Sequence, residues 1–213
     1  MEVDSLDFLF PTHFMVAKYD DDFTSFKQLS SSMQFECECS LCPSHSCKKK
    51  SCPSFQYCNR QRQNEGLKGV DIIALDDKQK MLFLIEAKDY RKEHNPPVDH
   101  IVAEVVKKFR DTLFGIWCGS LCETEKDKNG FLRLTRTKPF SLSFVFHFES
   151  PLVPYRTGLH RKSLTGDSKV VSLTTLKQRL MQKLGPMKNY VTVCNMETTN
   201  NNCAWTVTER TQA

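Results

Sequence analysis

The sequence predicts an α/β fold, in which a central mixed β-sheet is flanked by helices on both sides and carries a cysteine-rich, metal-binding insertion. Residues 69–75 and 81–88 are apolar runs separated by a polar turn, which is typical of a β-hairpin. An amphipathic segment follows, and then an apolar run at 142–148, which indicates that a helix connects two strands of one sheet. Six of the ten cysteines lie between positions 37 and 58, which predicts the insertion.

Length and composition agree with one compact domain. The 213 residues suit a single domain, 1–213, with a core at 67–150 and the insertion at 33–66. A net charge of +5 permits a polyanionic partner without requiring one. There is no apolar run of the length that crosses a membrane, and the acidic first residues do not match a secretory signal. We therefore expect a cytoplasmic protein with no membrane partner.

The N-terminal segment is expected to be helical. Residues 6–32 are assigned one or two helices, interrupted by three consecutive aspartates at 20–22. The side chains expected to reach the core from this segment are Phe8, Phe14, Phe23, Phe26 and Leu29.

The cysteine segment at 33–66 has the spacing of a compact metal knuckle. Thiolates a few residues apart can close a tetrahedral Zn²⁺ site, and the lysines at 48–50 favour the thiolate form. A disulfide-stapled loop, free thiols and an iron–sulfur cluster are the alternatives. A closed zinc site has no open coordination position, so we assign it a scaffold or nucleic-acid-gripping role. Zinc would take four or more ligands from Cys37, Cys39, Cys42, Cys47, Cys52 and Cys58.

The hairpin places three charged side chains on one face. If Leu75 pairs with Lys80 across the turn, alternation puts Asp71, Glu86 and Lys88 on the same side of the sheet. Charges inside strands this apolar are costly unless they are paired or bind a metal ion. Two carboxylates can hold Mg²⁺ or Mn²⁺ and an ammonium can stabilise a phosphate, so the set suits phosphodiester hydrolysis. A structural ion pair is the alternative.

The remaining segments alternate between helices and strands. After Pro97, apolar residues at helical spacing predict a helix of about twenty residues, whose solvent edge includes Glu104, Lys107 and Lys108. A solvated face explains both lysines. The run at 142–148 is a strand, and its His147 is expected to be a core histidine.

The C-terminal third begins with a basic loop at 150–170. Its candidate nucleic-acid contacts are Arg156, Arg161 and Lys162. A helix is expected to begin after Ser172 and to end at Gly185-Pro186. Residues 190–193 are assigned to an edge strand and 200–202 to a turn or frayed segment.

Asp71 followed fifteen residues later by Glu86-Ala87-Lys88, on a hairpin that leads into a helix, resembles the PD-(D/E)xK nuclease superfamily. The resemblance covers about residues 67–117, with weaker support to about 150. Val70 stands where that family usually has proline. Many members also carry a glutamate on the first core helix, for which Glu36 and Glu65 are candidates.

The resemblance implies a restriction-endonuclease-like core, Asp71 and Glu86 as ligands of Mg²⁺ or Mn²⁺, and Lys88 as the catalytic lysine. It also implies that the helix after this strand flanks the site, which makes Lys107 and Lys108 candidate phosphate contacts. The expected function is a metal-dependent nuclease that hydrolyses phosphodiester bonds, with DNA as the favoured substrate. A homodimer is left open. The alternatives are a non-catalytic nucleic-acid-binding protein and a zinc-organised protein-interaction module.

Overall fold

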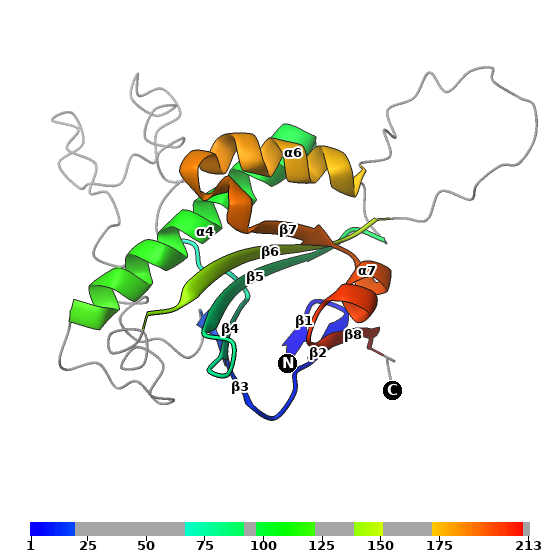
Figure 1. The fold of residues 1–213 in the computed structure, drawn as a ribbon. Helices are drawn as coiled ribbons and strands as arrows, with labels where there is room; N and C mark the ends of the chain where they lie inside the picture. Colours follow the sequence, from blue (N-terminus) through cyan, green and yellow to red (C-terminus); the bar gives the residue numbers. More distant parts are fainter. Residues whose placement is uncertain (20–66, 92–96, 122–138, 151–171, 211–213) are drawn as a thin grey trace, which may run out of the picture.

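The computed structural model describes residues 1–19, 67–91, 97–121, 139–150 and 172–210, and these form an α/β structure (Figure 1). The central sheet has the strand order β3-β4-β5-β6-β7. Strands β3, β4 and β5 are antiparallel neighbours, whereas β6 is parallel to β5 and β7 is parallel to β6, so the predicted mixed sheet is confirmed. The bounds of the strands are β3 Phe14–Lys18, β4 Ile72–Asp76, β5 Met81–Asp89, β6 Ser141–Glu149 and β7 Val191–Cys194.

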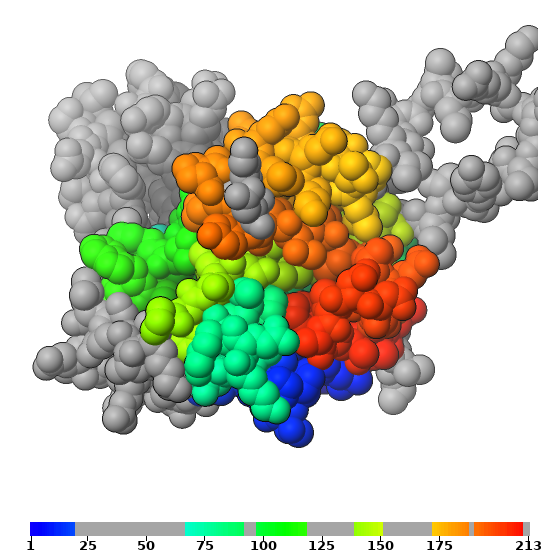
Figure 2. Space-filling model, in the orientation of Figure 1, coloured from blue at the N-terminus to red at the C-terminus, as the bar shows by residue number. Residues whose placement is uncertain are grey.

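The predicted hairpin is β4–β5, but its register differs by two residues. Leu75 lies opposite Leu82 rather than opposite Lys80. The reason is Asp76, which ends β4 and whose carboxylate Oδ1 accepts hydrogen bonds from the backbone N–H groups of Lys78 and Gln79. The turn therefore starts one residue later than expected. A shift of two residues keeps every side chain on its predicted face, and the tip of the hairpin lies at the surface (Figure 2).

Two helices cover one face of the central sheet (Figure 1). Helix α4, Val98–Leu121, connects β5 to the parallel strand β6, as predicted. Helix α6, Leu173–Leu184, connects β6 to β7 through the 3₁₀ segment η1, Gly185–Tyr190. Ser172 caps α6 by accepting a hydrogen bond from the N–H of Thr175, and Gly185 ends the helix at a positive φ of 56°.

The opposite face is covered differently from the prediction of helices on both sides. A second sheet of order β1-β2-β8 packs there together with α7, Met196–Asn202. Its strands are β1 Glu2–Val3, β2 Leu6–Leu9 and β8 Thr206–Glu209. The core between this layer and the central sheet includes Phe8, Phe14, Ile72, Ile85 and Trp205.

Two local predictions are wrong. Residues 6–9 and 14–18 are strands rather than helices, and in β2 the buried Leu6 and Phe8 alternate with less buried neighbours, which is the two-residue period of a strand. Residues 200–202 end helix α7 rather than forming a turn. The sequence of α7 is poor in strong helix formers, but Asn195 and Thr198 form a capping box and Thr199 is buried, so capping and packing stabilise the helix.

Several predicted features lie outside the described residues. These are the cysteine segment, the candidate helix residues beyond position 19, and the basic loop with Arg156, Arg161 and Lys162. Within the described part of the chain, no helix combines the length and apolar character that spanning a membrane requires.

Candidate active site

The strands bring Asp71, Glu86 and Lys88 together under helix α4. Asp71 directly precedes β4, and its Oδ2 accepts a 2.8 Å hydrogen bond from the backbone N–H of Ala87 on β5. Glu86 and Lys88 are two positions apart on β5, so they share one face, and Lys88 Nζ lies 3.3 Å from Glu86 Oε1. The hydrogen bond to Ala87 fixes Asp71 beside the two β5 side chains.

Glu86 is the most unusual group in this set. Its side chain is 0% exposed, and within the described part of the chain neither oxygen has a partner in good hydrogen-bond geometry. The pKa of Glu86 is raised to about 8, first by burial and then by the nearby charge of Asp71, although the ammonium groups of Lys108 and Lys88 act in the opposite direction. A buried carboxylate of this kind requires a cation to be ionised at neutral pH.

Helix α4 supplies two more charged groups to the same place. Lys108 Nζ lies 2.8 Å from Glu86 Oε1 and 3.3 Å from Asp71 Oδ1, so a single ammonium bridges both carboxylates. Glu104, one turn earlier, lies 3.5 Å from Lys88 Nζ. The carboxylates raise the pKa of both lysines, which keeps them charged. Three carboxylates and two ammonium groups therefore form one continuous cluster.

The same helix also holds the chain segment that leads to Asp71. Thr112 is fully buried, and its hydroxyl accepts a 2.9 Å hydrogen bond from the backbone N–H of Val70. Asp111 accepts a 2.8 Å hydrogen bond from the N–H of Lys68 and pairs with Lys107. Because these contacts hold the residues just before Asp71, α4 helps to set where its carboxylate lies.

The structure changes the expected roles of the α4 residues. Glu104 and Lys108 were assigned to the solvent edge of the helix, but both contact side chains of the hairpin, and Lys108 is only 12% exposed. Lys107 does pair along the helix surface, with Asp111. The sequence did hold a sign that Glu104 and Lys108 lie near the sheet. Each comes directly before a buried residue of the apolar stripe, Val105 or Phe109. The role of Thr112 has no comparable indication in the sequence.

The donor set is compatible with a hard divalent cation. Asp71 and Glu86 offer carboxylate oxygens, the ligand type of Mg²⁺, which binds through one or two carboxylates and keeps several water ligands. Glu86 also contributes a buried oxygen, Oε2, without a hydrogen bond from the described residues. No cluster of three or more His, Cys, Asp or Glu side chains suited to a metal occurs among the described residues. Asp71 and Glu86 are therefore the described side chains whose ligand chemistry suits such a cation.

His147 lies on the other side of the sheet and does not join this cluster. It is buried, its Nδ1 lies 3.2 Å from the hydroxyl of Thr199, and its Nε2 lies 2.9 Å from a carboxylate oxygen of Glu149. Its ring also contacts Phe8 edge to face. These contacts agree with the predicted core histidine.

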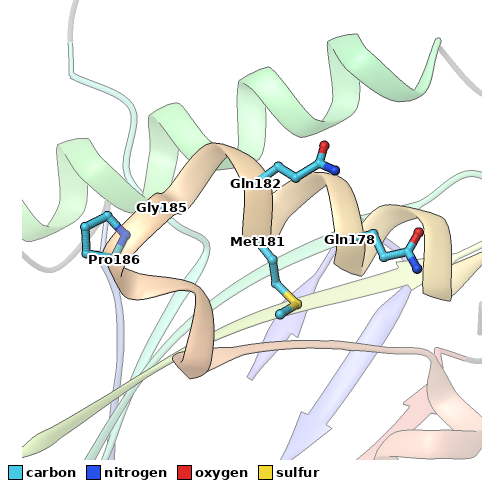
Figure 3. A pocket seen from close by; sticks show the side chains of 5 residues that line it. All are labelled: Gln178, Met181, Gln182, Gly185 and Pro186. Atoms are coloured by element: carbon cyan, nitrogen blue, oxygen red, sulfur yellow. The ribbon is translucent and has the colours of Figure 1, made fainter.

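A separate hollow lies at helix α6 and the start of η1, and no residue of the charged cluster is among its described lining (Figure 3). Its described lining carries no ionisable side chain, so the hollow offers none of the acid, base or cationic groups that hydrolysis requires. The lining residues are Gln178, Met181, Gln182, Gly185 and Pro186.

Comparison of the chain with profiles of protein families, with curated proteins and with solved structures found no match.

Proposed function

We propose that this protein is a Mg²⁺- or Mn²⁺-dependent nuclease that hydrolyses phosphodiester bonds, with DNA as the favoured substrate. The observation that carries the proposal is the convergence of Asp71, Glu86 and Lys88 on one side of the hairpin, with Glu86 fully buried. The proposal includes a restriction-endonuclease-like core around residues 67–150.

The charge of the cluster supports a phosphodiester substrate. When ionised, Asp71, Glu86 and Glu104 outnumber Lys88 and Lys108 by one, so the net charge is negative. One divalent cation would reverse it to a single positive charge, which matches the single negative charge of a phosphodiester. A site balanced in this way favours a substrate anion only when the cation is present.

Each side chain has a defined task in this proposal. Asp71 and Glu86 would hold the cation, which when bound supplies an activated water and stabilises negative charge on phosphate. Lys88, held between Glu86 and Glu104, directs an ammonium toward the phosphate oxygens as negative charge builds on them. The backbone N–H of Ala87 keeps Asp71 oriented throughout.

Two further parts of the proposal concern segments outside the described residues. The cysteines at 33–66 are proposed to bind zinc as a scaffold, and a cytoplasmic location would keep their thiols reduced. Arg156, Arg161 and Lys162 are proposed to contact the nucleic-acid backbone, which would make binding weaken as salt increases.

The test is cleavage of single-stranded, duplex, branched and RNA substrates with Mg²⁺ or Mn²⁺. Wild-type protein is expected to cut at least one substrate, and Asp71→Ala or Lys88→Ala is expected to reduce the rate by at least about 100-fold, a loss typical of removing one transition-state contact. Asp77→Ala and Lys80→Ala are matched controls, because this pair is an exposed ion pair at the hairpin tip. Both controls should cut like the wild type.

One observation favours a second candidate, a nucleic-acid-binding protein without catalysis. Lys88 and Lys108 already form ion pairs with the carboxylates, as in a structural ion cluster. Wild-type protein that binds nucleic acid but cuts nothing with any divalent cation would support this candidate. Protein that neither binds nor cuts would favour a zinc-organised interaction module instead.

A further inference from the structure

Lys108 occupies a distinctive position among the charged groups of the site. Its ammonium is the one described cation within 3.5 Å of both Asp71 and Glu86, at 3.3 Å and 2.8 Å. Lys88, by comparison, approaches Glu86 and Glu104. The two lysines therefore differ in which carboxylates they neutralise.

Lys108 contacts the same two carboxylates that would hold a divalent cation. Asp71 Oδ2 already accepts a hydrogen bond from the N–H of Ala87, and Lys108 contacts the other carboxylate oxygen, Oδ1. Lys108 also approaches Glu86 through Oε1. An ammonium and a divalent ion that both lie against this pair of carboxylates repel each other.

We propose that Lys108 is a tethered cation that competes with divalent metal for Asp71 and Glu86, and thereby lowers the affinity of the protein for free metal ions. This inference rests on the proposed metal-dependent function. The Lys108 side chain extends from α4 and is 12% exposed, so its ammonium can leave the carboxylates by rotation about its side-chain bonds. A phosphate oxygen is an alternative partner for an ammonium released in this way.

The proposal has a thermodynamic consequence. If metal displaces Lys108 and a phosphate then accepts its ammonium, each ligand favours the binding of the other. Lys108 would thus make tight metal binding depend on the presence of a phosphodiester. The residue would regulate metal loading in addition to contacting substrate.

The test measures Mn²⁺ binding to the full chain by titration calorimetry, without nucleic acid. Replacing Lys108 by methionine removes the charge and keeps a side chain of similar length. The Lys108→Met variant is expected to bind Mn²⁺ at least about tenfold more tightly than the wild type, because one unit of repulsive charge is removed from the ion's position. Lys108→Arg, which keeps the charge, should bind Mn²⁺ like the wild type.

Two additional variants test whether a change in Mn²⁺ affinity comes from the charge of Lys108. Lys108→Gln is neutral but polar, and it replaces the methionine variant if circular dichroism shows that the latter does not fold. Lys80→Met is the matched control, since Lys80 forms an ion pair with Asp77 at the exposed hairpin tip. Its Mn²⁺ affinity should equal that of the wild type.

The outcomes separate this inference from the proposed nuclease function. Tighter Mn²⁺ binding by the neutral variants supports the competition, even if the wild type binds no metal detectably or cuts no substrate. Unchanged or weaker Mn²⁺ binding overturns it and leaves a metal-dependent nuclease possible, with Lys108 only holding the carboxylates in place. Absence of Mn²⁺ binding by every variant overturns both proposals.

Discussion

Replacing Glu86 by glutamine is expected to remove a pH dependence of stability that this buried carboxyl creates. Glu86 is fully buried, and its pKa rises from the ordinary 4.5 to about 8. Between these two values the folded protein keeps the proton, whereas the unfolded chain releases it. The folded state therefore binds more protons, and the free energy of unfolding should fall as pH increases through this window.

The size of the effect follows from the pKa difference. A difference of this size corresponds to about 5 kcal/mol between pH 4.5 and 8 if Glu86 acts alone, since each unit is worth about 1.4 kcal/mol. Lys88 and Lys108 do not change the free energy of unfolding between pH 4.5 and 8. Their pKa values are raised above the ordinary 10.5, so both stay protonated in the folded and unfolded states throughout this range. We expect to observe a decrease of at least about 2 kcal/mol, since relaxation around Glu86 reduces the full value.

Urea denaturation at several pH values between 5 and 8, with a chelator present, measures this effect. The Glu86→Gln variant cannot titrate at this position, so the difference between wild type and variant isolates the contribution of Glu86 from all other groups. Mg²⁺ should restore wild-type stability most strongly near pH 8, where the carboxylate is ionised. A wild-type unfolding free energy that stays level or increases from pH 5 to 8, or a variant with the same slope, would refute the argument.

Two further predictions concern the support of the site and the cysteine segment. Thr112→Val removes the acceptor of the Val70 N–H while keeping the shape of the side chain, so it should cost about 1–3 kcal/mol in urea denaturation. The same variant should weaken Mn²⁺ binding, whereas Thr112→Ser should retain both properties; equal behaviour of the two variants would contradict the role of the hydroxyl. Metal analysis of the purified protein should find zinc on the cysteines of 33–66, and a strong chelator should lower the unfolding temperature. Protein with neither zinc nor iron would remove that assignment.

The sequence was sufficient to predict those elements whose structure depends on residues close together in the chain. Alternation in 69–75 and 81–88 predicted the hairpin, and parity alone placed Asp71, Glu86 and Lys88 on one face, so the assignment survived a register error of two residues. Apolar residues at helical spacing predicted α4, and Ser172 with Gly185 predicted both ends of α6. Each of these depends on residues close together in the chain.

Prediction failed where distant segments cooperate. The N-terminal strands were taken for helices because strands this short become stable only by pairing, β3 with β4 and β2 with β8 near the other end of the chain. Helix α7 depends on its cap and on the burial of Thr199, which a sequence poor in helix formers does not reveal.

The sequence by itself determined which residues could bear charge at the end of the hairpin. Only the tertiary structure decided that Glu104 and Lys108 complete the cluster and that Thr112 holds the segment before Asp71. The physical reason is that helical periodicity shows which side of α4 is apolar but not which strand residues its flanking charges will meet. That depends on how the helix packs across the sheet, which is set by contacts between residues 16 to 42 positions apart.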